Sequence, residues 1–248
     1  MLEKYHVGAY WKKRPETASE CARRLELFFH MLTRCDVSLH QWYTEGRVTR
    51  DSPGTSLPWN DREFLEKRLL QGRNRTDLGK KVIPELGFRL HTWNQRPDGR
   101  STRLNLVCGC YSEQVSNVCL LYPPIEGETV ERMLAFPTLH HVLESMITAW
   151  EPQWGLVTTQ DTRDALNPDP SEVDIGWITY LAREQGTVPP LPAPVSIQPV
   201  GSLGMLIILT PERFSASNPE HIALGRRVRE LLARAGLLDR RDQEILPP

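Results

Sequence analysis

The chain has 248 residues, of which 40% are hydrophobic and 25% charged, a composition typical of a globular protein. The net charge of −1 argues against a general nucleic-acid-binding protein. No apolar run approaches the length of a membrane span, and the first residues lack a signal-peptide pattern, so the sequence predicts a cytoplasmic protein. The five cysteines follow no secreted framework, which favours reduced, buried thiols over a zinc site.

The charge is distributed unevenly along the chain. Between Arg47 and Arg103, 13 Lys and Arg face 7 Asp and Glu, a net of +6. Between Glu113 and Glu184, 3 Arg face 12 Asp and Glu, a net of −9. A solvated surface explains any single charge, but a continuous block of −9 creates a negative field that can steer a basic partner.

Patterns of period two and period 3.6 predict the elements of the first half. In chain order these are a strand at 5–11, a helix at 17–35, a helix at 61–70, and an antiparallel meander with strands at about 86–93, 102–111 and 116–122. The sequence Pro97-Asp98-Gly99 is a strong turn signal between the first two strands of the meander.

The second half predicts a helix at 137–150, a strand at 154–157, a short helix at 159–166, an acidic loop at 167–174, and strands at 175–182 and 195–199. The clearest unit closes the chain, where a strand at 205–209, buried on both faces, leads into a helix that lies on the sheet. Ser217 and Glu220 fit a capping box for this helix. Its apolar stripe is predicted from four residues: Leu224, Val228, Leu231 and Ala235.

This order of elements predicts an α+β fold, with a mostly antiparallel sheet, helices packed on one face, and a closing strand–helix unit at the C-terminus. The expected organisation is a single domain over residues 1–248. Two sub-halves, 1–124 and 125–248, are suggested by a weak echo, because each half ends with a run of strands and a long helix.

The sequence contains fragments of functional sites and no complete one. His140, His141 and Glu144 share a helix face, but a metalloenzyme needs further ligands at a recognised spacing, so an exposed helix is the favoured interpretation. Asp161 and Asp164 suit the first turn of a helix. No nucleophile elbow, phosphate loop or dinucleotide fingerprint occurs. We therefore predict a non-enzyme with no catalytic, metal-binding or cofactor-binding residues.

Several longer phrases carry a resemblance to a known family. They are the segments 8–25, 150–157, 176–181, 189–194 and 212–221. Together they resemble the immunity protein 52 family of bacterial polymorphic toxin systems, and the likeness is weakest between residues 47 and 86. The resemblance implies a cognate antitoxin that neutralises a restriction-endonuclease-like DNase effector, as in type VI secretion systems. It carries over no catalytic residue and leaves the binding surface unassigned.

A DNase binds its substrate with Lys and Arg, so an inhibitor that mimics the polyanion needs carboxylates on a rigid face. Tryptophans beside such carboxylates are suitable anchors for a partner. The predicted partner-binding residues are therefore Trp150, Glu151, Trp154, Asp161, Asp164, Asp169, Glu172 and Asp174.

Two alternatives remain open at this point. The first is an enzyme that acts on the toxin or its damage through His140, His141, Glu144 or His221. The second is an accessory or adaptor protein of the secretion system that shares the fold.

Overall fold

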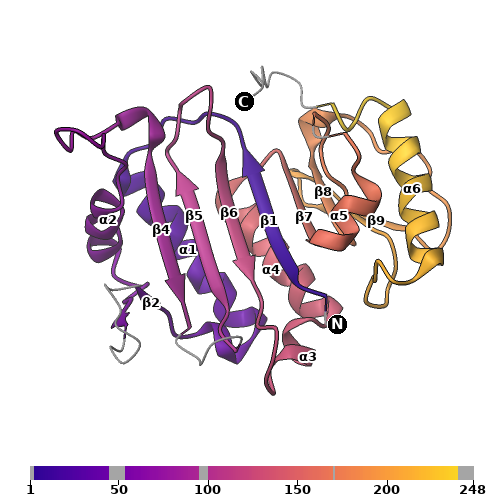
Figure 1. Ribbon diagram of the computed structural model, residues 1–248, viewed down its shortest axis with the longest axis horizontal. Coiled ribbons are helices and arrows are strands. Elements are labelled where there is room, and N and C mark those ends of the chain that lie inside the picture. Colours follow the sequence, from indigo (N-terminus) through magenta and orange to yellow (C-terminus); the bar gives the residue numbers. More distant parts are fainter. Residues whose placement is uncertain (1–2, 45–53, 95–99, 170, 240–248) are drawn as a thin grey trace.

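The structure, a computed structural model, describes residues 3–44, 54–94, 100–169 and 171–239. Within these residues a ten-stranded sheet runs in the order β3-β2-β4-β5-β6-β1-β7-β8-β10-β9, and every neighbouring pair is antiparallel (Figure 1). This arrangement confirms the predicted α+β class. The predicted turn Pro97-Asp98-Gly99 lies outside the described residues.

Eight of the ten described strands follow the predicted pattern, whereas the two-residue strands β2 and β3 were not predicted. Their bounds are β1 (Tyr5–Trp11), β2 (Tyr43–Thr44), β3 (Thr55–Ser56), β4 (Phe88–Trp93), β5 (Arg103–Cys108), β6 (Asn117–Tyr122), β7 (Trp154–Thr159), β8 (Ile178–Ala182), β9 (Ser196–Val200) and β10 (Gly204–Ile208). The predicted meander is β4-β5-β6, and the closing strand is β10. In β10 the side chains from Leu206 to Ile208 are buried on both faces, as their apolar run predicts.

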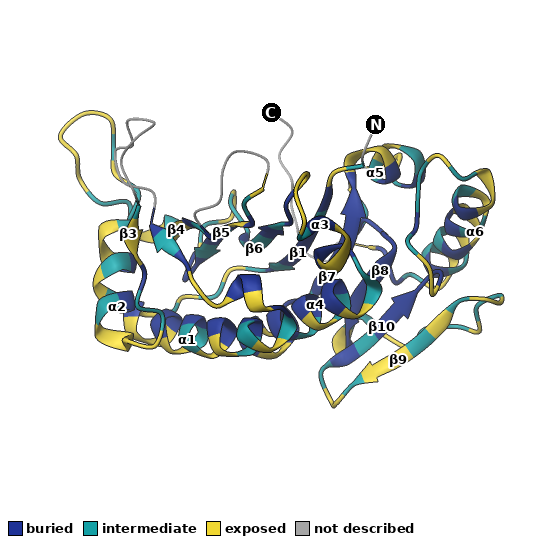
Figure 2. Ribbon diagram, turned by 90° about the horizontal axis from the view of Figure 1, so that it is seen from below, coloured by how far each residue is buried: buried dark blue, intermediate teal, exposed yellow. Residues whose placement is uncertain are grey.

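The helices occupy both faces of the sheet. Their bounds are α1 (Ala18–Cys35), α2 (Arg62–Gln71), α3 (Val130–Met133), α4 (Phe136–Trp150), α5 (Gln160–Leu166) and α6 (Pro219–Arg234), with 3₁₀ turns at Val37–Leu39, Pro84–Leu86 and Arg183–Gln185. Helices α1, α2 and α4 cover one face, as expected, whereas α5 and α6 stand on the opposite face at the far end of the sheet (Figure 2).

Strand β1 lies at the centre of the sheet, although it is the first element of the chain. It pairs with β6 on one side, with Val7 opposite Leu121, and with β7 on the other, with Val7 opposite Val157. Its inward side chains, at Val7, Ala9 and Trp11, are buried against the helical layer. The two predicted sub-halves therefore meet in one continuous sheet.

Helix α1 begins and packs as its sequence predicts. The Thr17 hydroxyl accepts a hydrogen bond from the Glu20 amide, and the Glu20 carboxylate accepts one from the Thr17 amide, which completes a capping box. Cys21, Leu25 and Phe28 lie on its buried face. This face packs on α4 and α2, so the helical layer is built by local periodicity and then fixed by contact between helices.

Helix α6 corrects two predictions. Its N-cap is Asn218, whose side chain accepts from the Glu220 amide, so the expected capping box at Ser217 is absent. Its buried face consists of His221, Gly225, Val228 and Leu232, whereas the expected Leu224 and Leu231 are half-buried and Ala235 is exposed. The face is rotated because α6 packs on α5. A Cβ at Gly225 would lie 2.7 Å from a methyl carbon of Leu166, so the approach of the two helices needs a glycine.

Candidate binding face and its pocket

Among the described residues, no helix covers one face of the sheet over four neighbouring strands, β4, β5, β6 and β1 (Figure 2). The strands alternate regularly, so every second side chain points away from α1 and α4. We call this surface the open face. Its residues are Arg89, His91, Trp93, Arg103, Asn105, Val107, Val118, Leu120, Tyr122, His6, Gly8 and Tyr10. All of them except Gly8 are half-buried or exposed.

Registers place these side chains in rows across the strands. Trp93 lies opposite Arg103, and Arg103 lies opposite Tyr122, whose ring is 6.0 Å from that of His6. In the next row His91 lies opposite Asn105, with its Nδ1 2.9 Å from the Asn105 Oδ1. The open face thus brings aromatic rings and arginines into contact range across strands.

The charge of the open face has a single sign. The segments of β4, β5, β6 and β1 contain no Asp or Glu, and Arg89 and Arg103 are their permanently charged residues. Both arginines are exposed, while Val107, Val118 and Leu120 between them and β1 are half-buried. A surface with an apolar centre and cations at one end follows from this arrangement.

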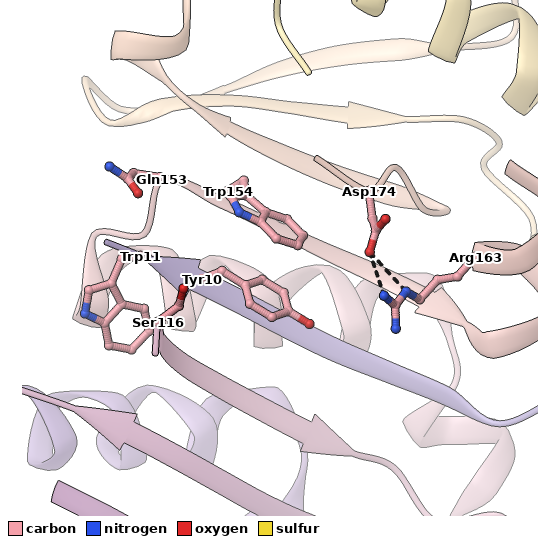
Figure 3. A pocket seen from close by; sticks show the side chains of 7 residues that line it. All are labelled: Tyr10, Trp11, Ser116, Gln153, Trp154, Arg163 and Asp174. Atoms are coloured by element: carbon pink, nitrogen blue, oxygen red, sulfur yellow. Dashed lines mark hydrogen bonds and ion pairs between the residues drawn. The ribbon is translucent and has the colours of Figure 1, made fainter. Parts of the chain in front are cut away.

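A pocket of about 240 Å³ lies where the open face meets α5, and it is lined by Tyr10, Trp11, Ser116, Gln153, Trp154, Arg163 and Asp174 (Figure 3). The rings of Tyr10 and Trp154 stack with centroids 4.0 Å apart. The Tyr10 side chain lies back along its own strand over Gly8. A Cβ at Gly8 would come within 2.9 Å of the Tyr10 ring and hydroxyl. Gly8 therefore makes room for the aromatic wall of the pocket.

The opposite wall of the pocket is an ion pair. The Arg163 guanidinium on α5 donates to the Asp174 carboxylate over 3.0 Å from Nε and 2.8 Å from Nη2. Asp174 is only 5% exposed, so its charge requires this partner. The pair fixes α5 against the segment that leads into β8, and it does not offer a free carboxylate to a partner protein.

His6 lies on the open face near this ion pair. Burial, reinforced by the positive charge of Arg163 and opposed by Asp174, lowers the pKa of His6 from 6.5 to about 4. The unfolded chain therefore takes up a proton between pH 6.5 and pH 4 that the folded chain does not take up.

The first testable prediction is a loss of stability at acid pH. We expect the free energy of unfolding to fall as the pH drops from 6.5 to 4, with a contribution of up to about one proton from His6. Urea unfolding of the wild type and of His6→Gln across this range measures the effect. The variant should have the shallower slope, and equal slopes in the two proteins would contradict the assignment to His6.

The structure places the predicted partner-binding residues in different environments. Asp161 and Asp164 are exposed and belong to α5, which stands on the side of the sheet that carries the open face, and Asp169 beyond this helix is also exposed. Glu172 is paired with Arg229, as Asp174 is with Arg163. The predicted set is thus brought together only in part.

The remaining three predicted residues lie around the junction of α4 and β7. Glu151 is at the left-handed C-cap of α4, with φ of 47°, and its carboxylate accepts from Arg24 over 3.1 Å. Trp154 is 8% exposed and forms the aromatic wall of the pocket. Trp150 is fully buried, stacked on Trp11 at 5.3 Å, so its indole packs in the core and has no surface to offer a partner.

The histidines proposed for an enzymatic role have structural partners. The ligand atoms of His140, His141 and Glu144 all lie within 4.8 Å of one another, and His140 Nδ1 is 3.4 Å from the Glu144 carboxylate. A polar contact between residues one helical turn apart accounts for this geometry. His221 accepts a hydrogen bond from the Ser215 amide at Nδ1 over 3.0 Å, and its ring stacks on Phe214. It therefore fixes the segment that precedes α6.

A second hollow, a groove of about 590 Å³, lies on the helical side between α1, α4 and the start of α2. Its charges largely satisfy one another. Arg24 pairs with Glu16 and Glu151, and Arg62 pairs with Glu26. This internal pairing makes the groove less suitable for a charged partner than the open face.

The predicted partner-binding residues do not include any residue of the open face, although Arg89 and Arg103 fall in the basic segment 47–103, the alternative place for the interface. A signal was present in the alternation of Arg89, His91 and Trp93 with buried Phe88, Leu90 and Thr92. Alternation shows which side chains share a face, but it does not show which face the helices will cover.

Comparison with known proteins identifies the family of this chain. The chain belongs to the immunity protein 52 family, whose profile matches residues 3–241. This match confirms the resemblance carried by the N-terminal and C-terminal phrases, and membership of an immunity-protein family implies a toxin partner.

Among solved structures, the Pseudomonas aeruginosa T6SS protein PA0821 is similar with a TM-score of 0.55 and 14% sequence identity, over 92% of this chain and 72% of that chain. At this identity the similarity establishes the shared fold alone. No curated protein matches the sequence. In the described part of the chain, no helix has the length and apolar character needed to cross a membrane.

Proposed function

We propose that this protein is an antitoxin that binds a cognate secreted toxin and neutralises it by covering its working surface, so that producer and kin cells are protected. The observation that carries the proposal is the family match over residues 3–241. The geometry supports it, because a sheet held on one side by packed helices presents a rigid surface on the other.

The finer part of the proposal concerns the kind of toxin. A DNase effector of the restriction-endonuclease-like class binds DNA with Lys and Arg, and the exposed Asp161, Asp164 and Asp169 compete for those cations. Within the family the chain resembles TsiT, the immunity partner of the type VI effector TseT, so that effector is the first toxin to test. An encounter in the cytoplasm, where the DNA substrate lies, fits this role.

The test is a titration of nuclease activity with the purified protein, at a toxin concentration well above Kd. A binder abolishes activity at about one equivalent, because each toxin molecule is occupied by one inhibitor. An enzyme that modifies the toxin protects at far below one equivalent. Substoichiometric protection would therefore contradict the proposal and favour the enzymatic alternative.

A triple variant, Asp161→Lys, Asp164→Lys and Asp169→Lys, tests the nuclease-specific part of the proposal separately in the same titration. If these carboxylates occupy the DNA-binding cations, Kd for the toxin rises by about 10-fold or more. Reversal of Asp77, Glu126 and Glu128 to Lys, three exposed acids outside α5, is the matched control. Equal affinities of the two variants would leave the antitoxin role intact and remove the DNA-mimic role.

A further inference from the structure

The open face has the composition of a protein-binding hot spot. Trp93, Arg103 and Tyr122 are cross-strand neighbours in one row, and Tyr, Trp and Arg are the residues that dominate binding energy at protein interfaces. Half-buried Val107, Val118 and Leu120 lie beside this row and form an apolar centre. A sheet face of this kind is normally covered, by helices in the same chain or by a partner.

The charge of the open face defines the chemistry of the partner. With Arg89 and Arg103 exposed and no carboxylate in β4, β5, β6 or β1, an acidic surface is attracted and a basic one is repelled. The acidic residues of α5 lie at the opposite end of the same side of the molecule. The surface is therefore polarised, with cations over β4 and β5 and anions over α5.

We propose that the open face is the toxin-binding surface, and that the region of the toxin that docks over β4 and β5 carries exposed carboxylates around an apolar patch. This inference rests on the proposed function and adds to it the surface and the partner chemistry. Arg103, which lies opposite Trp93 on one side and Tyr122 on the other, forms the central charged contact, and Arg89 forms a second contact two rows away.

A nucleic acid fits the open face less well than a protein does. Two arginines neutralise few phosphates, and the net charge of the whole chain is −1. The half-buried valines and leucine in the centre cannot bind a charged phosphate backbone, whereas they can pack against an apolar protein patch. The aromatic rings are compatible with stacked bases, so the experiment includes a single-stranded oligonucleotide.

The test compares two double charge reversals in binding to a catalytically inactivated toxin. In Arg89→Glu/Arg103→Glu both changes lie on the open face, and we expect Kd to rise by about 100-fold, with most of the change in the dissociation rate. In Arg23→Glu/Arg34→Glu two exposed arginines of α1, on the helical side, undergo the same change in charge. This control should stay within about 3-fold of the wild type.

A second measurement does not depend on mutation. Hydroxyl-radical footprinting of the wild-type complex should protect Tyr122 and Trp93 on the open face, while Trp59, which lines the helical groove, stays as reactive as in the free protein. Circular dichroism of each variant confirms that the fold is kept. Should Arg89→Glu/Arg103→Glu lose its fold, the milder Arg89→Gln/Arg103→Gln replaces it.

The outcomes separate the inference from the proposed function. Tight toxin binding by the open-face variant, with no protection of Tyr122, overturns the inference and leaves the antitoxin role standing. No toxin binding by the wild type overturns both. Concentration-dependent dimerisation that Arg89→Glu/Arg103→Glu abolishes would assign the open face to a second copy. Salt-sensitive binding of the oligonucleotide at the same residues would assign it to nucleic acid.

Discussion

Replacing Trp150 with alanine is expected to lower the free energy of unfolding by about 4 kcal/mol, the cost typical of truncating a fully buried tryptophan. The indole is 0% exposed, stacks on Trp11 at 5.3 Å and meets Phe28 edge-on at 6.5 Å. Its removal leaves a cavity between β1, α1 and α4, where the helical layer is attached to the centre of the sheet. Chemical denaturation followed by circular dichroism measures the loss.

The matched control is Trp150→Phe, which keeps the ring in the core. The Trp150 Nε1 group is buried without a hydrogen-bond partner, so phenylalanine removes an unsatisfied donor along with part of the ring, and the expected cost is below about 2 kcal/mol. If Trp150→Ala kept wild-type stability and lost toxin binding, the indole would be the partner anchor that its place beside the acidic block suggested.

Replacing Gly87 with alanine should destabilise the fold by about 3 to 4 kcal/mol, because two costs act at one residue. Gly87 has φ of +61° and ψ of −140°, a backbone conformation reserved for glycine. A Cβ there would also lie 2.3 Å from the Cys108 carbonyl oxygen and 2.6 Å from the Cys110 amide nitrogen. The clash falls at the start of β4, the strand that carries Arg89.

A substitution at Gly79 separates the cost of the backbone conformation from the cost of the close contact. Its φ of +78° is also positive, but a Cβ at this position meets nothing within 4 Å. Gly79→Ala should therefore cost only about 1 kcal/mol, the conformational part of the effect. Thermal or urea unfolding of both variants tests the comparison, and equal destabilisation would show that the close contact at Gly87 relaxes at little cost.

The two ends of the candidate surface fit the nuclease partner that we propose for this protein. A metal-dependent nuclease holds its cation with carboxylates and its DNA with Lys and Arg, so both signs occur close together on it. The open face provides arginines over β4 and β5, and α5 provides carboxylates at the other end. Interface charges of both signs fix the orientation of the correct partner and disfavour the binding of other proteins.

Much of the fold could be predicted from the sequence because it depends on neighbouring residues. Thr17 and Glu20 define the start of α1, and the alternation of β4, β5 and β6 defines a meander whose strands pair in chain order. The class α+β follows from these patterns, and the family follows from the sequence segments at both ends of the chain that resemble it. Short-range periodicity and capping require no knowledge of distant contacts.

The tertiary structure decided what depends on residues far apart. The first strand lies between β6 and β7, more than 100 residues away in sequence, and that placement turns the Trp11 and Trp150 side chains into a core stack. The burial of Asp174 and its pairing with Arg163, and the rotation of α6 onto Leu166, depend equally on such contacts.

The candidate site illustrates the same division. The sequence by itself determined that Arg89 and Arg103 sit on strands, that these strands lack carboxylates, and that every second side chain shares a face. Only the packing of α1, α2 and α4 decided which face would stay open, because the period of a strand specifies two sides and leaves their covering to long-range contacts.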